Sequence, residues 1–369
     1  MLEVLIPALI ILIGLSLLKV PIYISVFCSA IYLQLFVNHM SLSSLFTGFF
    51  EAMTKNSLLA VPFFMVAGSI IAASSLGTRL INVCIELLKS VRGGLPIACV
   101  IANAIFGAIS GSGPAATATF GKVAFKPLSD HHGESMALGI ITSSACLSTI
   151  IPPSITMIIY GVATETSITQ LFMAGVLPGV FIVIVIGAYL VIRCKRRPGE
   201  ERERFSASGF AKAFWKGIPV LLLPVIVLGS VYTGFCTPTE SGALAAAYSF
   251  VVAVFGTRDI KPRQLLSIFK DSGRTTAQVF LLIAASTVFA QAITVAQVPA
   301  AVTAAFSGMS QVQFLLMLNI LLLIVGCFFD TSAAILILAP ILLPTALGLN
   351  IHPLHLGMVF VVNLAIGLF

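Results

Sequence analysis

Two short apolar segments joined by a Gly/Ser/Pro turn constrain this chain more than any other feature. The first segment is Pro96–Ile109, the turn is Ser110-Gly111-Ser112-Gly113-Pro114, and the second segment is Ala115–Pro127. Spanning the ~30 Å hydrocarbon core of a bilayer requires about 20 helical residues, so neither segment crosses it alone. The pattern predicts a re-entrant helical hairpin. Lipid cannot satisfy the backbone groups of its tip, so the tip must face protein or a watery cavity.

A second unusual segment follows, because the apolar stretch Ser135–Ala163 is interrupted by Pro152-Pro153. Neither proline has an N–H, so the carbonyls of Ser148 and Thr149 lose their helical donors. Unwound backbone beside small hydroxyl residues is typical of ion sites in transporters. The alternative is an ordinary proline kink beside a glycine-rich loop. We favour an ion or substrate site because the tip and the break occur together at membrane depth.

Composition places the whole chain in the membrane. Hydrophobic residues make up 59% and charged residues 9%, whereas soluble domains carry about 25% charged residues. The seven cysteines include no Cys-x-x-Cys pair, which argues against a disulfide framework or a zinc site. The chain has no Gly-x-x-x-x-Gly-Lys-Ser/Thr loop, so we expect no ATP hydrolysis. The net charge of +7 lies in loops between spans and does not indicate a nucleic-acid partner.

A basic linker divides the chain into two halves. It runs from Arg193 to Lys216 after the apolar span Leu171–Ile192, and the positive-inside rule predicts that it is cytoplasmic. Trp215 lies where the linker returns to the membrane, as expected of an interfacial anchor. Earlier in the chain, Arg79–Lys89 has the pattern of a short amphipathic helix that lies along the interface.

The two halves match at a constant offset of 219 positions. Leu58–Ala67 corresponds to Ala277–Ser286, Gly107 to Gly326, and Ser112 to Thr331; Asn103 and Asn319 have similar places. We count an odd number of crossings between equivalent points, so we expect an inverted repeat with its binding site midway between the copies. Phe369 corresponds to Ile150, so we expect the given chain to stop just before a second proline-pair break.

Five motifs resemble those of the large membrane subunit of tripartite ATP-independent periplasmic (TRAP) transporters, within the ion-transporter superfamily. They are Leu58-Leu59-Ala60-Val61-Pro62-Phe63-Phe64-Met65-Val66-Ala67-Gly68, Gly111-Ser112-Gly113-Pro114, Ile151-Pro152-Pro153-Ser154, Thr237-Pro238-Thr239-Glu240, and Asp330 with Ala339-Pro340-Ile341-Leu342-Leu343-Pro344. The resemblance covers essentially the whole chain. It implies an all-α polytopic membrane protein with an inverted repeat, two re-entrant hairpins, two broken helices and an elevator-type arrangement of scaffold and transport domain.

The resemblance also implies boundaries and partners. We expect scaffold helices and an arm at 1–75, a transport-domain half at 76–192, the linker at 193–216, a second scaffold part at 217–275, and a second transport-domain half at 276–369. The implied partners are a small four-helix membrane subunit, a periplasmic substrate-binding protein and the lipid of the bacterial inner membrane. The implied activity is sodium-driven import of an organic acid, with Na⁺ as coupling ion and no other cofactor.

The candidate site residues come from both hairpins and both helices that follow them. We expect ion binding by Ser110, Ser112, Gly113, Ser148, Thr149, Asp330, Thr331 and Ser332. We expect substrate binding by Gly111, Ser112, Pro114, Pro152, Pro153, Ser154 and Asn363.

Two acidic residues, Glu240 and Asp330, stand in apolar surroundings, where a charge is costly. Asp330 is expected to be a cation ligand rather than a buried structural hydrogen-bonding group. Glu240 is equally well explained as the cap of a helix that begins at Ser241.

Several functions remain open at this stage. The substrate is a C4-dicarboxylate, a sialic acid or another carboxylate, and a sodium-coupled carboxylate symporter without a binding protein is the main alternative. A channel and an intramembrane serine protease are less favoured. The protease would use the Ser110–Gly113 turn as its nucleophile loop and would need a histidine or lysine base at membrane depth.

Overall fold

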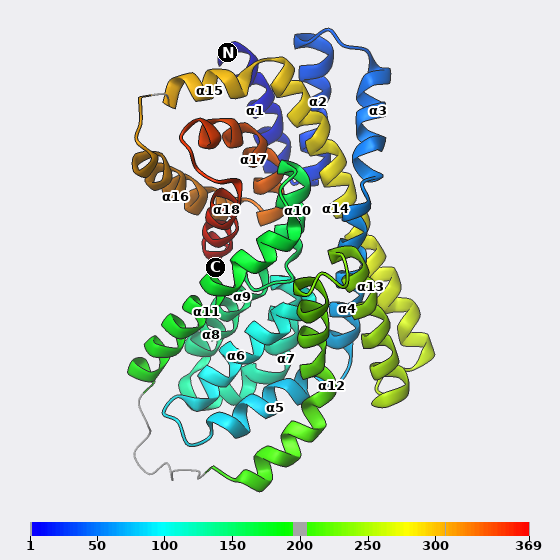
Figure 1. The fold of residues 1–369 in the computed structure, drawn as a ribbon, viewed down its shortest axis with the longest axis vertical. Coiled ribbons are helices and arrows are strands. Elements are labelled where there is room, and N and C mark those ends of the chain that lie inside the picture. Colours follow the sequence, from blue (N-terminus) through cyan, green and yellow to red (C-terminus); the bar gives the residue numbers. More distant parts are fainter. Residues whose placement is uncertain (1, 195–204, 307, 369) are drawn as a thin grey trace. The chain divides into compact units, whose positions relative to one another are not determined.

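The computed structural model describes residues 2–194, 205–306 and 308–368, and these fold into helices joined by short loops (Figure 1). Within these residues, eight helical segments are long and apolar enough to cross a membrane. The elements up to the linker are α1 Leu2–Leu17, α2 Ile22–Tyr32, η1 Leu33–Val37, α3 Leu42–Met53, η2 Asn56–Leu59, α4 Ala60–Ala73, α5 Leu76–Leu88, α6 Gly94–Ser110, α7 Gly113–His132, α8 Glu134–Ala145, α9 Leu147–Ile150, α10 Ile155–Thr164 and α11 Ile168–Arg193. Those after it are α12 Ala207–Tyr232, α13 Pro238–Val251, η3 Val252–Gly256, α14 Pro262–Val295, α15 Val298–Phe306, α16 Gln311–Phe328, α17 Thr331–Gly348 and α18 Pro353–Gly367.

The internal repeat is visible in these bounds. The two π-helical turns, η1 and η3, begin and end 219 positions apart, at Leu33–Val37 and Val252–Gly256. The predicted hairpin α6–α7 has its counterpart in α16–α17, and α8 has its counterpart in α18. One long helix, α14, corresponds to α3 and α4 together. The offset inferred from the sequence therefore describes elements as well as residues.

The chain forms two compact units, and each draws on both halves. The first unit contains residues 1–59, 158–171 and 273–368, and the second contains 60–157 and 172–272. Each unit thus joins the opening helices of one half to the hairpin helices of the other. The scaffold and transport-domain boundaries expected from the sequence remain a prediction.

In the second unit, the hairpin α6–α7 packs with α8 and α9, while α4 packs on α13 and α5 on α12. The rings of Phe106 and Phe120 meet edge to face with centroids 5.5 Å apart, which holds the two hairpin helices together. Gly242 lets α13 approach α4 closely, since a Cβ there would lie 3.2 Å from the Cβ of Phe63.

In the first unit, α16 packs on α18, and α17 packs on α15 and α18. The Tyr160 hydroxyl donates to the Pro353 carbonyl at 2.9 Å, and Gly357 leaves room for the Tyr160 ring. Asn38 donates to the Ala292 carbonyl at 2.9 Å and so ties the loop after η1 to the end of α14.

Several predicted helix boundaries were wrong. The hairpin helices are longer than the expected Pro96–Ile109 and Ala115–Pro127: α6 begins at Gly94, and α7 continues through Pro127 to His132. Pro127 removes one backbone hydrogen bond, but the buried side chains Ala124 and Leu128 keep this part of α7 packed. In the second half, α13 begins at Pro238 and not at Ser241.

Glu240 is a helix cap and not a residue in apolar surroundings. Thr237 and Glu240 form a capping box at the start of α13: the Glu240 carboxylate accepts the Thr237 N–H at 2.8 Å, and the Thr237 hydroxyl accepts the Glu240 N–H at 3.3 Å. The side chain is exposed. Of the two explanations offered by the sequence, capping therefore applies, although the helix starts earlier than expected.

Candidate functional site

The tip of the first hairpin packs directly on the helix break. Gly111 ends α6 in a left-handed conformation with φ 57°, and its carbonyl accepts the Ile155 N–H at 3.4 Å. A Cβ at Gly111 would lie 3.0 Å from the Pro153 carbonyl oxygen. Both the positive φ and this approach require glycine at the turn. The two unusual features of the sequence are therefore in contact.

Hydroxyl groups take over part of the hydrogen bonding that the prolines remove. The Thr149 carbonyl accepts from the Ser154 hydroxyl at 2.5 Å and from the Thr156 hydroxyl at 3.0 Å, and the two hydroxyls are 2.7 Å apart. The break thus frees this carbonyl from the helix, as predicted, but does not leave it bare. All three side chains are buried, so the break presents a compact group of oxygen atoms inside the second unit.

Ser148 lies where the broken helix approaches the first hairpin helix most closely. A Cβ at Gly107 would lie 2.4 Å from the Ser148 Cα, and the Ser148 hydroxyl donates to the Asn103 carbonyl at 3.4 Å. The Asn103 amide nitrogen donates to the Ser144 hydroxyl at 2.7 Å. Its amide oxygen is buried without a hydrogen-bond partner among the described residues, which is costly unless a ligand or water reaches it.

The tip of the second hairpin has a different chemistry. Asp330 caps α17 by accepting the Ser332 N–H at 2.9 Å, and its side chain is exposed. Asp330 thus lies at the second hairpin tip, as expected, and directly precedes α17. Its apolar surroundings and its role as a cation ligand remain predictions. The hydroxyl of Thr331 is buried and has no hydrogen-bond partner within the described part of the chain.

Asn363 takes part in helix packing in the first unit. Its amide nitrogen donates to the Asn319 amide oxygen at 2.7 Å and to the Val359 carbonyl at 2.8 Å. Asn319 is on α16 and Asn363 on α18, so this contact joins the second hairpin to the helix behind it. Substrate binding by Asn363 remains a prediction, and its amide N–H groups already have partners.

The predicted residues fall into two groups. The second unit holds the tip residues and the break residues, which are Ser110, Gly111, Ser112, Gly113, Pro114, Ser148, Thr149, Pro152, Pro153 and Ser154. The first unit holds Asp330, Thr331, Ser332 and Asn363. Sequence reasoning missed Ser144 and Thr156. The offset of 219 relates Ser144 to the candidate Asn363, and Thr156 closely follows the proline pair. The sequence therefore contained a signal that could have identified each of them as a site residue.

The donor set suits a hard cation more than a transition metal. Within residues 2–194, 205–306 and 308–368, no group of three or more His, Cys, Asp or Glu side chains is placed to hold a metal ion. Hydroxyl and carbonyl oxygens, by contrast, are the ligands preferred by hard cations. The break and the two tips are rich in such oxygens.

Comparison with known proteins identifies a family that matches nearly the whole chain. The family "Tripartite ATP-independent periplasmic transporter, DctM component" matches residues 9–369. The C4-dicarboxylate TRAP transporter large permease protein DctM of Pseudomonas aeruginosa is 40% identical over 335 residues, which cover 89% of this chain and 78% of that protein.

Two further proteins are similar to this chain. The isethionate TRAP transporter permease protein DctMQ of Oleidesulfovibrio alaskensis is 36% identical over 323 residues, covering 86% of this chain and 51% of that protein. The crystal structure of the Alcanivorax borkumensis YdaH transporter superposes with a TM-score of 0.58 at 15% identity, over 88% of this chain and 76% of that one. That likeness supports the polytopic helical fold.

Proposed function

Because the chain belongs to the DctM-component family of tripartite ATP-independent periplasmic transporters, we propose that it is a permease subunit that imports a small organic anion with sodium. The observation that carries the proposal is the contact between the Gly111 tip and the Pro152-Pro153 break. It gathers carbonyl and hydroxyl oxygens around interrupted helices, and interrupted helices hold coupling ions in secondary transporters.

The substrate class follows from the relatives and from helix electrostatics. The two permeases described above are named for a C4-dicarboxylate and for isethionate, both of which are small organic anions. Helices α7 and α17 begin at the hairpin tips, so their N-termini lie there. Helix N-termini favour negatively charged ligands. We therefore propose a small carboxylate, with a C4-dicarboxylate as the first candidate to test.

The partners and the motion belong to the same proposal. A periplasmic binding protein would deliver the anion, and a small membrane subunit would cover part of the apolar surface. The two hairpins would move together as one transport domain in an elevator cycle in the bacterial inner membrane. A symporter that works without a binding protein remains the alternative. Transport is favoured over proteolysis because the matched family is a transporter component.

Uptake by reconstituted full-length protein tests the proposal. Proteoliposomes containing the permease and its small subunit should accumulate radiolabelled C4-dicarboxylate only with an inward sodium gradient and with the binding protein outside. Uptake that persists when choline replaces sodium would rule out sodium coupling. Uptake that is unchanged without the binding protein would favour the simpler symporter.

A pair of variants connects the activity to the break. Ser154→Ala removes one of the two hydroxyls on the Thr149 carbonyl, so we expect a sodium concentration for half-maximal uptake roughly tenfold higher, equivalent to about 1.4 kcal/mol. Ser143→Ala is the matched control, because among the described residues the Ser143 hydroxyl hydrogen-bonds to the Ile140 carbonyl of its own helix, at 3.5 Å, and not to the break. Equal effects of the two substitutions would argue against an ion site at the break.

A further inference from the structure

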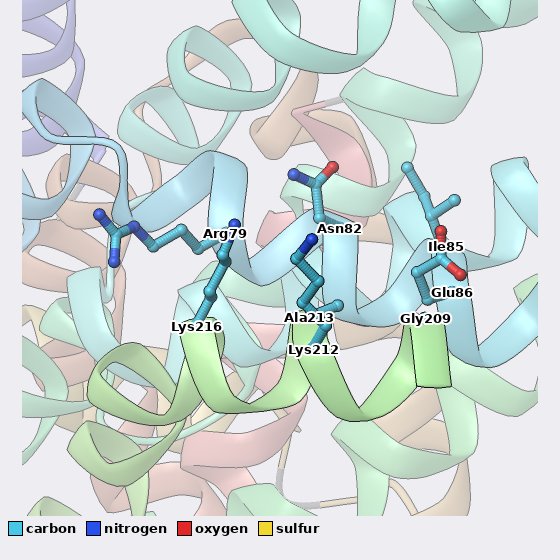
Figure 2. Close-up of a pocket in the computed structure, with 8 residues that line it drawn as sticks. All are labelled: Arg79, Asn82, Ile85, Glu86, Gly209, Lys212, Ala213 and Lys216. Atoms are coloured by element: carbon cyan, nitrogen blue, oxygen red, sulfur yellow. The ribbon is translucent and has the colours of Figure 1, made fainter. Parts of the chain in front are cut away.

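A cavity of about 430 Å³ lies between α5 and the first turns of α12 in the second unit (Figure 2). Two glycines of α12 bring the helices close on either side of it. A Cβ at Gly209 would lie 2.9 Å from the Glu86 carboxylate, and a Cβ at Gly217 would lie 2.5 Å from the Val83 side chain. Between these contacts the helices leave a hollow of the size that holds small ligands, about 300–1,000 Å³.

The cavity carries an excess of positive charge. Lys212 and Lys216 are one turn apart on α12, and both side chains extend toward α5, where Asn82 also lines the cavity (Figure 2). The ion pairs in the described part of the chain do not include either lysine. Glu86, the acid that lines the cavity, pairs with Lys89 at 3.3 Å. Its charge is thus offset, whereas no carboxylate among the described residues forms an ion pair with either lysine.

Arg79 adds a third positive charge at the other end of the cavity. Its Nε donates to the Ser75 hydroxyl at 2.9 Å, and that hydroxyl donates in turn to the Asp259 carboxylate. Arg79 is thus held in place by its neighbours. The ligands that this cavity offers to an anion are therefore the two lysine amino groups and the amide of Asn82.

The cavity lies at the depth of lipid headgroups. The charged residues of α12, Lys212 and Lys216, lie in its first part, and no charged residue follows from Gly217 to Tyr232, which marks the edge of the hydrocarbon region. Trp215 is 73% exposed at this edge, where tryptophan side chains anchor membrane helices. Further along α12, Leu222 and Val225 are 43% and 65% exposed, so the helix presents apolar side chains on its side away from α5.

We propose that this cavity binds the phosphate of an anionic phospholipid headgroup, held by Lys212, Lys216 and Asn82. Basic residues at the cytoplasmic face attract anionic lipids, and each contributes about fivefold to binding. The place of the cavity beside Trp215, where the charged part of α12 ends, favours a lipid over free inorganic phosphate. This site is separate from the hairpin tips and does not depend on the identity of the transported anion.

Native mass spectrometry of the full-length protein tests the site, with phosphatidylglycerol as the probe and phosphatidylethanolamine as the zwitterionic comparison. We expect wild type to retain phosphatidylglycerol preferentially. Lys212→Gln with Lys216→Gln should weaken that binding roughly 10- to 30-fold, and replacing both lysines by arginine should preserve it. The matched control is Lys122→Gln with Lys126→Gln, because these two exposed lysines have the same spacing on α7 and lie outside the cavity.

The outcomes separate the possible ligands. Selective loss of phosphatidylglycerol in the Lys212/Lys216 variant supports the proposal. Equal loss in the Lys122/Lys126 variant would show general charge attraction and overturn it. In a third outcome, millimolar inorganic phosphate displaces the lipid from wild type and from the control but has no effect on the Lys212/Lys216 variant. That outcome would identify a free-phosphate site and would also overturn the proposal.

Discussion

Asn363 donates a hydrogen bond to Asn319 across 2.7 Å, and Asn103 donates one to Ser144 across 2.7 Å. Each bond joins the first helix of a hairpin to the helix packed behind it, once in each unit. The offset of 219 relates Ser144 to Asn363. The same offset relates Asn103 to Leu322, which is three residues from Asn319. The polar contacts of the two halves therefore lie within about one helical turn of the same place.

A glycine contact accompanies this hydrogen bond in both units. A Cβ at Gly107 would lie 2.4 Å from the Ser148 Cα, and a Cβ at Gly326 would lie 3.1 Å from the Gly367 Cα. Gly326 and Gly367 correspond to Gly107 and Ser148 in the repeat. Small residues allow helices in membranes to approach closely, and polar side chains then bond across the gap. This pairing is the common structural core of the two halves.

The first prediction concerns the asparagine pair. A double-mutant cycle with Asn319→Ala and Asn363→Ala should give a coupling energy of about 0.6 kcal/mol and at most ~1.7 kcal/mol, the range of hydrogen bonds between membrane helices. Unfolding of the purified protein in bicelles would measure it. A coupling energy indistinguishable from zero would mean that the bond contributes nothing beyond packing.

The second prediction concerns Gly107. Gly107→Ala would place a methyl group against the Ser148 backbone, so we expect a loss of roughly 1–3 kcal/mol through overpacking. Gly139→Ala on α8 is the control, because its new Cβ would meet nothing within 4 Å and alanine favours a helix by about 1 kcal/mol. Thermal unfolding of the two variants should shift in opposite directions. A stable Gly107→Ala protein would contradict the close packing of these helices.

The sequence predicted the elements better than it predicted their contacts. The hairpin follows from the length of its apolar segments, and the break at Pro152 follows from the missing proline N–H groups. The repeat follows from the constant offset between the halves. All three can be read from the order of residues along the chain. Helix ends were less accurate because Pro127 is tolerated in a packed helix and Thr237 caps α13 earlier than expected.

The contacts themselves depend on which helices pack together. Nothing in the local sequence of Asp259 indicates that it bonds to Ser75, which is 184 positions away. Likewise, the sequence around Ser154 and Thr156 does not indicate that their hydroxyls both donate to the Thr149 carbonyl. Asp330 was expected at the second hairpin tip, where the structure places it, but its bond to the Ser332 N–H at the start of α17 was not predicted.

The third prediction concerns the pH dependence of the loop after η3. Burial alone would raise the pKa of Asp259, but hydrogen bonds from Ser75 and Thr257 and the positive charge of Arg79 outweigh it and lower the pKa below its ordinary value. The carboxylate therefore adds stability above the unfolded pKa of about 3.9, and this contribution is lost as the pH falls through the folded pKa.

Thermal unfolding of wild type and Asp259→Asn at several pH values checks this. The destabilisation caused by Asp259→Asn should be largest near neutral pH and should shrink as the pH falls below about 4. Ser75→Ala removes a hydroxyl that donates to the carboxylate, so it should flatten the same pH dependence. A difference between wild type and Asp259→Asn that does not change with pH would contradict the assignment.

The fourth prediction concerns Asp330 as a sodium ligand. Asp330→Asn keeps an oxygen that can accept the Ser332 N–H, so the cap and the fold should survive. It removes a negative charge that would offset the charge of a bound cation. We therefore expect the sodium concentration for half-maximal uptake to rise roughly tenfold, equivalent to about 1.4 kcal/mol, with an unchanged unfolding temperature.

Two companion variants separate capping from ion binding at this tip. Asp330→Ala removes the cap and should also lower stability by about 1 kcal/mol. Thr331→Val replaces a buried hydroxyl that has no partner within the described residues, so it should weaken sodium dependence without destabilising the protein. If Asp330→Asn and Thr331→Val both transport with the sodium dependence of wild type, the second hairpin tip does not bind the coupling ion, and Asp330 serves only to begin α17.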